Sequence, residues 1–402
     1  MLNSTSPQSV WRRYLNSLRS GWVSLRGRRS RHIRRGVRRS GFEATEALEH
    51  RVMLAGAIGE VTSFTKISDT AGGFTATLDD EDRFGESIAD IEDLDGDGIR
   101  DIAVGTRLDD DGGSNRGATY VLLLNANGTV KSQKKISDTQ GGFTATLDNS
   151  DFFGNALTSL GDLDGDGITD LAIGANGDDD GGGAYSDHGA VYVLFLNADG
   201  TVKSHQKISD TQGGFTATLG SGNRFGCSLT NLGDLDGDGI VDLAVGAFGD
   251  SDGASSAGAV YVLFLNSDGT VKSHQKISAT SGGFTATLDP VDLFGYSLSS
   301  MGDLDGDGNA DLAVGTGGDD DGGTQRGAAY LLFLDSDGTV KSHQKISDTE
   351  GNLQAHWKME TSLDARYQIL VIWTATALLT WLSEHKRMTM AEEIVGRSTH
   401  FF

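Results

Sequence analysis

The sequence predicts an all-β fold, a β-propeller of tandem four-stranded blades. Three observations lead to this prediction, and the first two are internal repeats, which are the signature of such an array. The string DLDGDG occurs at spacings of 69, 72 and 69 residues, beginning at Asp93, Asp162, Asp234 and Asp303. A string beginning KIS and ending GGFTATL recurs with it, from Lys66, Lys135, Lys207 and Lys276. The third observation is that each repeat contains four strand-like segments.

The third repeat shows these segments in order. Residues 228–232 alternate and run into the DLDGDG loop, and residues 242–246 are short and apolar. Residues 259–265 read AVYVLFL, a β-branched and aromatic run without alternation, which is typical of a strand covered on both faces. Asp268 and Gly269 then favour a hairpin turn. The last segment, 270–278, is polar and contains lysine, as expected of the outer edge of a sheet.

The repeats divide the chain into three parts. We assign residues 1–56 to an Arg-rich export or targeting segment, 57–350 to the propeller repeats and 351–402 to a tail outside the repeat. A partial unit at about 57–79 precedes complete units at 80–148, 149–220, 221–289 and 290–350, and residues 61–68 match the fourth strand of a blade. The KIS string returns at Lys345 without GGFTATL, so the repeat breaks off within a unit.

The tail allows two interpretations. Residues 367–382 are apolar, which suggests a membrane anchor or a docking helix. This run has 16 residues, fewer than the ~20 that a helix needs to span a bilayer. The alternative is a frameshifted or disordered tail without selected structure, which the break within a unit favours. We therefore do not predict a membrane span here.

Charge is divided unevenly along the chain. The net charge of −24 combines +9 in residues 1–51 with −33 in the remainder. An acidic body of this kind repels nucleic acid and anionic membranes and attracts cations, so we expect no nucleic-acid partner. The single cysteine, Cys227, excludes an intrachain disulfide and is best interpreted as an ordinary packing thiol.

The DLDGDG strings have the chemistry of a calcium loop. Each nine-residue loop carries Asp at positions 1, 3, 5 and 9 and Gly at positions 4 and 6. Calcium prefers six to eight oxygen ligands in an adaptable shell, and alternate residues of a curled loop can point inward together. With the position-7 carbonyl included, the predicted ligands are Asp93, Asp95, Asp97, Ile99 and Asp101; Asp162, Asp164, Asp166, Ile168 and Asp170; Asp234, Asp236, Asp238, Ile240 and Asp242; and Asp303, Asp305, Asp307, Asn309 and Asp311.

We therefore expect about four Ca²⁺ ions, one for each complete repeat. The spacing is similar to the first half of an EF-hand loop, but the Glu at position 12 is missing and a strand follows instead of a helix. Four acidic turns without a metal are the alternative, which the mutual repulsion of four carboxylates disfavours. Magnesium is disfavoured because its rigid octahedral shell suits water better than a crowded carboxylate cage.

A second acidic cluster follows each loop, at 109–111, 178–180, 250–252 and 319–321. It is either an additional cation site or a solvated turn between strands, and Asp-Gly clusters are ordinary turn chemistry. His205, His274 and His343 share one repeat position on a polar strand and are predicted to be exposed edge residues. The sequence contains no catalytic or phosphate-binding signature, so we predict no enzyme activity and no catalytic or cofactor-binding residue.

Beside the loops, two further motifs carry a resemblance to a known family. Phe-Gly pairs precede the loops at Phe84, Phe153, Phe225 and Phe294, and a Gly-Ala-Pro-like triplet follows each loop at Gly105, Gly174, Gly246 and Gly315. These units resemble FG-GAP repeats, which build the β-propeller of integrin α chains, over about residues 58–350. The resemblance places the cation loop between the first two strands of each blade. Integrin-type propellers have seven blades, so whether four units close into one ring stays open.

The N-terminal segment resembles a bacterial export signal of the LEPR type. Residues 46–54 read EALEHRVML, in which His50 and Met53 depart from the usual Pro and Leu. The basic residues before it are not followed by the apolar core of an ordinary signal peptide. The resemblance implies a bacterial protein exported to the cell surface or the exterior. The alternatives are an organellar transit peptide and a nucleic-acid-binding basic arm, and the acidic body disfavours the second.

Together these features predict an extracellular, calcium-binding, integrin-α-like repeat protein that mediates cell adhesion or binds a protein or glycan. One alternative is the non-catalytic propeller part of a hydrolase or a lectin-type protein. The other is a truncated product without function, which the interrupted fifth unit suggests.

Overall fold

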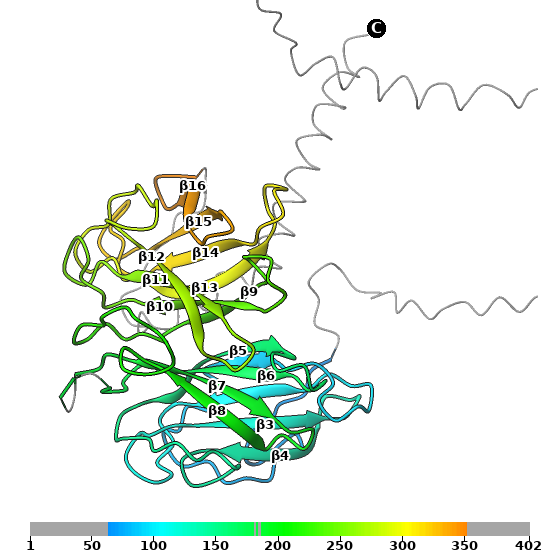
Figure 1. The fold of residues 1–402 in the computed structure, drawn as a ribbon. Helices are drawn as coiled ribbons and strands as arrows, with labels where there is room; N and C mark the ends of the chain where they lie inside the picture. Colours follow the sequence, from blue (N-terminus) through cyan, green and yellow to red (C-terminus); the bar gives the residue numbers. More distant parts are fainter. Residues whose placement is uncertain (1–62, 181, 184–185, 352–402) are drawn as a thin grey trace, which may run out of the picture. The chain divides into compact units, whose positions relative to one another are not determined.

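The computed structural model describes residues 63–180, 182–183 and 186–351 (Figure 1). They form sixteen strands in four separate four-stranded sheets, with no helix in these ranges. Blade 1 contains β1 (Ile88–Asp90), β2 (Ile102–Thr106), β3 (Ala118–Leu124) and β4 (Val130–Ile136). Blade 2 contains β5 (Phe153–Gly161), β6 (Asp170–Ala175), β7 (Ala190–Leu196) and β8 (Val202–Ile208).

The second half of the array repeats this plan. Blade 3 contains β9 (Leu229–Gly233), β10 (Asp242–Ala247), β11 (Ala259–Leu265) and β12 (Val271–Ser278). Blade 4 contains β13 (Phe294–Gly302), β14 (Asp311–Thr316), β15 (Ala328–Leu334) and β16 (Val340–Ile346). In every blade the strands pair antiparallel in chain order. The predicted all-β architecture of tandem four-stranded blades is confirmed, and the four segments predicted in the third repeat are β9 to β12.

The cores lie between consecutive blades. Every residue of β7 and β11 is buried, as the unalternating AVYVLFL run predicts. One apolar cluster joins blades 1 and 2, where Val121 and Leu123 meet Leu157 and Leu194. Equivalent clusters join blades 2 and 3 and blades 3 and 4. Each sheet is therefore covered by its neighbour, which is why the third strand of a blade can be apolar on both faces.

The GGFTATL segment fastens each blade to the next. The Val202 amide at the start of β8 donates to the Gly141 carbonyl oxygen over 2.8 Å, so the segment leaving blade 1 lies along the outer strand of blade 2. Its Phe143 is buried, with its ring centroid 5.0 Å from that of Phe153 and 5.4 Å from that of Tyr192. The His205 ring lies 5.0 Å from Phe143 and is partly buried, so the histidine is less exposed than predicted.

The same segment explains an error at the start of the array. Residues 61–68 were predicted as a fourth strand, but their described part, 63–68, contains only a bridge from Ser68 to Ala71. The chain then crosses to blade 1, where the Val130 amide donates to the Gly72 carbonyl oxygen and Phe74 is buried. This stretch has the sequence of a strand, but no strand of the described residues lies beside it, and a strand needs a partner for its backbone groups.

Replacing Phe143 with Ala should destabilise the fold. The ring comes from the segment that leaves blade 1 and is buried against aromatic rings of blade 2, and losses of this kind cost about 3–5 kcal/mol. The unfolding free energy, measured by denaturant titration at fixed calcium, should fall by that amount. Thr144→Ala is the matched control, because Thr144 is the exposed neighbour in the same segment. Equal stability of the two variants would show that the segment does not hold the blades together.

Candidate metal centres

Each Asp-rich loop connects the first strand of a blade to the second. In blade 2 it leaves β5 at Gly161 and enters β6 at Asp170. The loop curls because its own amides bond its own carboxylates: Gly167 N–H donates to Asp162 over 2.9 Å and Ile168 N–H donates to Asp166 over 2.9 Å. Gly167 has a φ of +87°, a backbone conformation that glycine adopts without strain. The Gly at position 6 therefore permits the turn that brings the carboxylates together.

Three carboxylates converge in every loop. One oxygen from each of positions 1, 3 and 9 lies within 4.8 Å of the others. The four groups are Asp93, Asp95 and Asp101; Asp162, Asp164 and Asp170; Asp234, Asp236 and Asp242; and Asp303, Asp305 and Asp311. This geometry, an all-oxygen donor set on an adaptable loop, fits the shell that calcium prefers.

The position-9 carboxylate is the fixed part of the site. Asp170 is 1% exposed, and its two oxygens accept hydrogen bonds from Leu163 N–H over 3.0 Å and Leu196 N–H over 3.1 Å. The first bond holds the loop and the second holds the end of β7. Burial nevertheless raises the pKa of Asp170 to about 6, and that of Asp242 in blade 3 to about 6. A cation at the loop would favour the charged form of these buried groups.

The position-5 carboxylate contacts a lysine, and this contact was not predicted from the sequence. In blade 1 the Lys131 Nζ lies 2.6 Å from Asp95 and 2.6 Å from Asp97, at positions 3 and 5. Lys203, Lys272 and Lys341, the second residues of β8, β12 and β16, make the same pair of contacts. The repeated Val-Lys-Ser string at the start of each fourth strand is the signal that could have indicated this contact.

The predicted ligands thus fall into three groups. Positions 1, 3 and 9 converge, and position 5 turns toward the lysine together with position 3. The residues at position 7, which are Ile99, Ile168, Ile240 and Asn309, donate their backbone N–H to the position-5 carboxylate. The complete ligand set, including the position-5 carboxylates and the position-7 carbonyls, stays a prediction.

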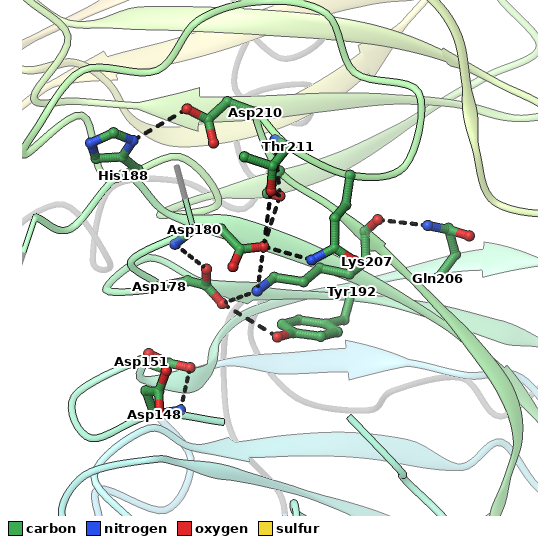
Figure 2. Close-up of polar contacts among 12 residues, drawn as sticks. Asp148, Asp151, Asp178, Asp180, His188, Tyr192, Gln206, Lys207, Asp210 and Thr211 are labelled. Carbon is green, nitrogen blue, oxygen red and sulfur yellow. Dashed lines mark hydrogen bonds and ion pairs between the residues drawn. The ribbon is translucent and has the colours of Figure 1, made fainter. Parts of the chain in front are cut away.

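The second acidic cluster is a partly buried ion-pair network (Figure 2). In blade 2 the Lys207 Nζ lies 2.7 Å from Asp178 and 2.8 Å from Asp180 and rests on the Tyr192 ring. Asp178 is 2% exposed and accepts a hydrogen bond from the Tyr192 hydroxyl over 3.3 Å. Equivalent aspartates are buried in the other blades, at Asp109, Asp250 and Asp319. The solvated turn favoured from the sequence was therefore wrong for the first Asp of each cluster, which is buried and paired with a lysine of the same blade.

A further buried carboxyl belongs to this network in blade 2. Asp151 is 2% exposed and accepts a hydrogen bond from the Asp148 amide. Burial, and then the charge of Asp178, raise the pKa of Asp151 to about 7. Blade 3 carries Asn223 at this position, and its amide donates to Asp250 over 2.9 Å. A neutral donor is therefore already present at this position in one blade.

Comparison with known proteins agrees with the repeat structure. The FG-GAP repeat family model matches residues 153–194, 226–263 and 294–332. Integrin alpha-PS2 of Drosophila melanogaster is 33% identical over 244 residues, which are 60% of this chain and 16% of that protein. Integrin alpha-5 of Xenopus laevis is 31% identical over 69% of this chain and 24% of its own length. Integrin alpha-2 of Mus musculus is 29% identical over 68% and 22%. The chain thus spans less than a quarter of each of these relatives.

Removing the loop lysines should tighten calcium binding. Each ammonium group bonds two of the carboxylates that a cation would use, so it competes with the ion for them. A variant with Lys131, Lys203, Lys272 and Lys341 all changed to Met should bind calcium roughly fivefold more tightly in calorimetric titration at low salt. The control changes the exposed neighbours Ser132, Ser204, Ser273 and Ser342 to Met. Equal or weaker binding by the lysine variant would contradict the competition.

Replacing Asp151 with Asn should stabilise the fold above neutral pH. The folded-state pKa of Asp151 lies above its unfolded value, so its stabilising contribution is complete below about pH 4 and is lost as the pH rises through about 7. The Asn variant lacks this loss, and its unfolding free energy at pH 8 should exceed that of the native chain by about 1–4 kcal/mol. The two proteins should converge near pH 4.

The reciprocal change in blade 3 supplies the control for this pH effect. Asn223→Asp places a carboxyl beside Asp250 and should lower the unfolding free energy at pH 8 more than at pH 4. Stability curves with the same pH dependence in the native chain and both variants would rule out a titrating carboxyl at this position.

Proposed function

We propose that this chain, an integrin-α-like array of FG-GAP repeats, is a calcium-stabilised binding module that acts outside the cell. The observation that carries the proposal is the recurrence of one carboxylate loop at the same place in all four blades. A single acidic turn would say little, whereas four copies with the same three converging oxygens support one selected chemistry. That chemistry is the binding of a hard divalent cation by oxygen ligands.

Calcium would have a structural role at these loops. The position-9 Asp is bonded both to the loop and to the end of the third strand, so an ion held by this Asp would brace three strands of one blade. The bound ion would supply positive charge that offsets the repulsion among the loop carboxylates. The chain's own residues shape the site. The backbone amides of the loop hold it in a curl, and the buried position-9 Asp holds the loop against the end of the third strand.

Binding, rather than catalysis, is the activity that these features support. Perturbed titratable groups mark catalytic sites when they gather in one cleft. Among the described residues, the Lys-Asp-Asp-Tyr group of blade 2 recurs in blades 1, 3 and 4, with Lys135, Lys276 and Lys345. A group repeated in every blade favours a contribution to the fold. We therefore propose a module that is not an enzyme.

The proposed location is the cell surface or the exterior of a bacterium. The resemblance of residues 46–54 to a LEPR-type export segment supports it, although these residues and the apolar run 367–382 lie outside the described ranges. Extracellular calcium modules commonly work at about 0.1–1 mM calcium, which suits exposed loops of this kind. A protein or carbohydrate at the cell surface is the proposed ligand, as the likeness to integrin α chains suggests.

The part of the chain that the structure describes contains no helix long and apolar enough to cross a membrane.

Calcium titration of the full chain tests the proposal. Calorimetry should give about four sites, and saturating calcium should raise the melting temperature relative to chelator, because a ligand at ten times its Kd adds about 1.4 kcal/mol for each site. Asp234→Asn removes a converging ligand in blade 3 and should lower the stoichiometry by one. Asp199→Asn, in the exposed β7–β8 turn, is the matched control and should not. No binding heat together with an unchanged melting temperature would overturn the calcium assignment.

A further inference from the structure

Three equivalent contacts join the blades through glycine. A Cβ atom built on Gly105 in β2 would lie 2.1 Å from the Gly154 carbonyl oxygen in blade 2. A Cβ atom built on Gly174 would lie 2.0 Å from the Gly226 carbonyl oxygen in blade 3, and one built on Gly246 would lie 2.1 Å from the Gly295 carbonyl oxygen in blade 4. In blades 1 to 3 the glycine after the Asp-rich loop therefore touches the Phe-Gly pair of the following blade, and a larger residue would not fit there without a shift of the backbone. Each contact has an outgoing side on one blade and an incoming side on the next.

Within the described ranges, blade 1 carries an incoming side that is open around Gly85 and Ile88, whereas Tyr120 on the same face is buried beneath Phe74. A Cβ on Gly154, Gly226 or Gly295 would lie 2.3–2.4 Å from a carbonyl oxygen of the preceding blade, whereas one on Gly85 has no neighbour within 4 Å. Ile88 on the same face is 61% exposed. Its counterparts Leu157 and Leu229 are 7% and 8% exposed. This incoming face, defined by Phe84, Gly85 and Ile88, is thus built for a blade that does not precede it among the described residues.

Blade 4 carries the complementary outgoing side. A Cβ on Gly117, Gly189 or Gly258 would lie 2.1 Å from a Phe carbonyl oxygen of the next blade. Gly327 holds the same repeat position in blade 4, but a Cβ atom built on it would have as its nearest neighbour the Thr316 carbonyl oxygen of its own blade, at 3.1 Å. Leu331 and Phe333 are partly exposed, although their counterparts in blades 1 to 3 are buried. We name Gly327, Leu331 and Phe333 the outgoing face.

We propose that the outgoing face of one molecule binds the incoming face of a second copy of this chain. The two faces are the halves of a contact that the chain already makes three times within itself, which defines the geometry and the chemistry of the fit. Polar groups match as well: Ser87 and Ser228 donate to the carbonyl oxygens of Gly154 and Gly295, and Ser297 holds the same position in blade 4. Ser297 would donate to the Gly85 carbonyl oxygen of the second copy.

The contact would be head to tail. Such heterologous contacts close into a ring or extend into a filament. Two molecules with four sheets each would bring eight sheets together, which lies within the usual range of closed propellers. Closure would cover both faces of both molecules, and burial of the exposed apolar side chains would drive the association.

Light scattering coupled to size exclusion, with the full chain at saturating calcium, tests the proposal. The native chain should show a concentration-dependent mass of two or more copies. Ile88→Asp should weaken association more than tenfold, because a charge would be buried at the contact. Val291→Asp is the matched control, since Val291 is also an exposed apolar residue, 46% exposed, but lies outside both faces. A monomeric native chain at all concentrations would overturn the proposal.

A mixing experiment separates head-to-tail contact from other modes of association. Leu331→Asp disables the outgoing face and leaves the incoming face intact, whereas Ile88→Asp does the reverse. Each variant alone should be monomeric, and an equimolar mixture should form a one-to-one dimer that does not grow. Circular dichroism of each variant checks that the fold is retained, and Phe333→Asp replaces Leu331→Asp if that variant unfolds. Monomers in the mixture, with both variants folded, would contradict the proposal.

Discussion

The structure depends on the buried position-9 aspartate of each loop. Asp170 and its equivalents stand where the loop, the second strand and the end of the third strand meet, and one carboxylate bonds two of these elements. A buried charge is expensive unless it is hydrogen-bonded or paired. The backbone amides meet part of this need, although burial still raises the pKa of Asp170 to about 6. A cation bound at the loop, as proposed above, would meet the rest.

The blade also contains its own counter-charges, which is why so acidic a body can fold. The β3–β4 register places Lys135 opposite Tyr120, and the lysine then reaches over the ring to two aspartates. Four residues earlier on β4, where the β3–β4 register shifts, Lys131 lies at the outer loop carboxylates. One strand thus supplies cations to both acidic clusters. The lysine of the inner cluster is partly buried, whereas the loop lysine is exposed, where a bound ion, as proposed, would displace it.

The sequence was sufficient for the fold and for part of the site. Repeats, turn residues and apolar runs located the strands, because these are local signals that recur in each unit. Residues 63–68 were misjudged because strand formation depends on a partner that no local pattern reveals. Lys131 and Lys135 were taken as edge residues, and Asp109 as part of a solvated turn. Their pairing follows from register and from close packing across the sheet, and no spacing rule along the chain encodes it.

Repetition also determines where the array is weakest. In a repeat protein, stability is approximately a sum of unit terms and nearest-neighbour interface terms. Each of the three interfaces between consecutive blades buries an apolar cluster and packs glycine against backbone, so each adds an interface free energy to the stability of the array. Among the described residues, blade 1 and blade 4 each make only one interface with another blade. On their other faces Ile88, Leu331 and Phe333 are more exposed than their counterparts in the other blades. A metal ion held within a blade strengthens the unit term but cannot supply a missing interface. Calcium and end-to-end association should therefore stabilise the array independently of each other, the first blade by blade and the second at its ends.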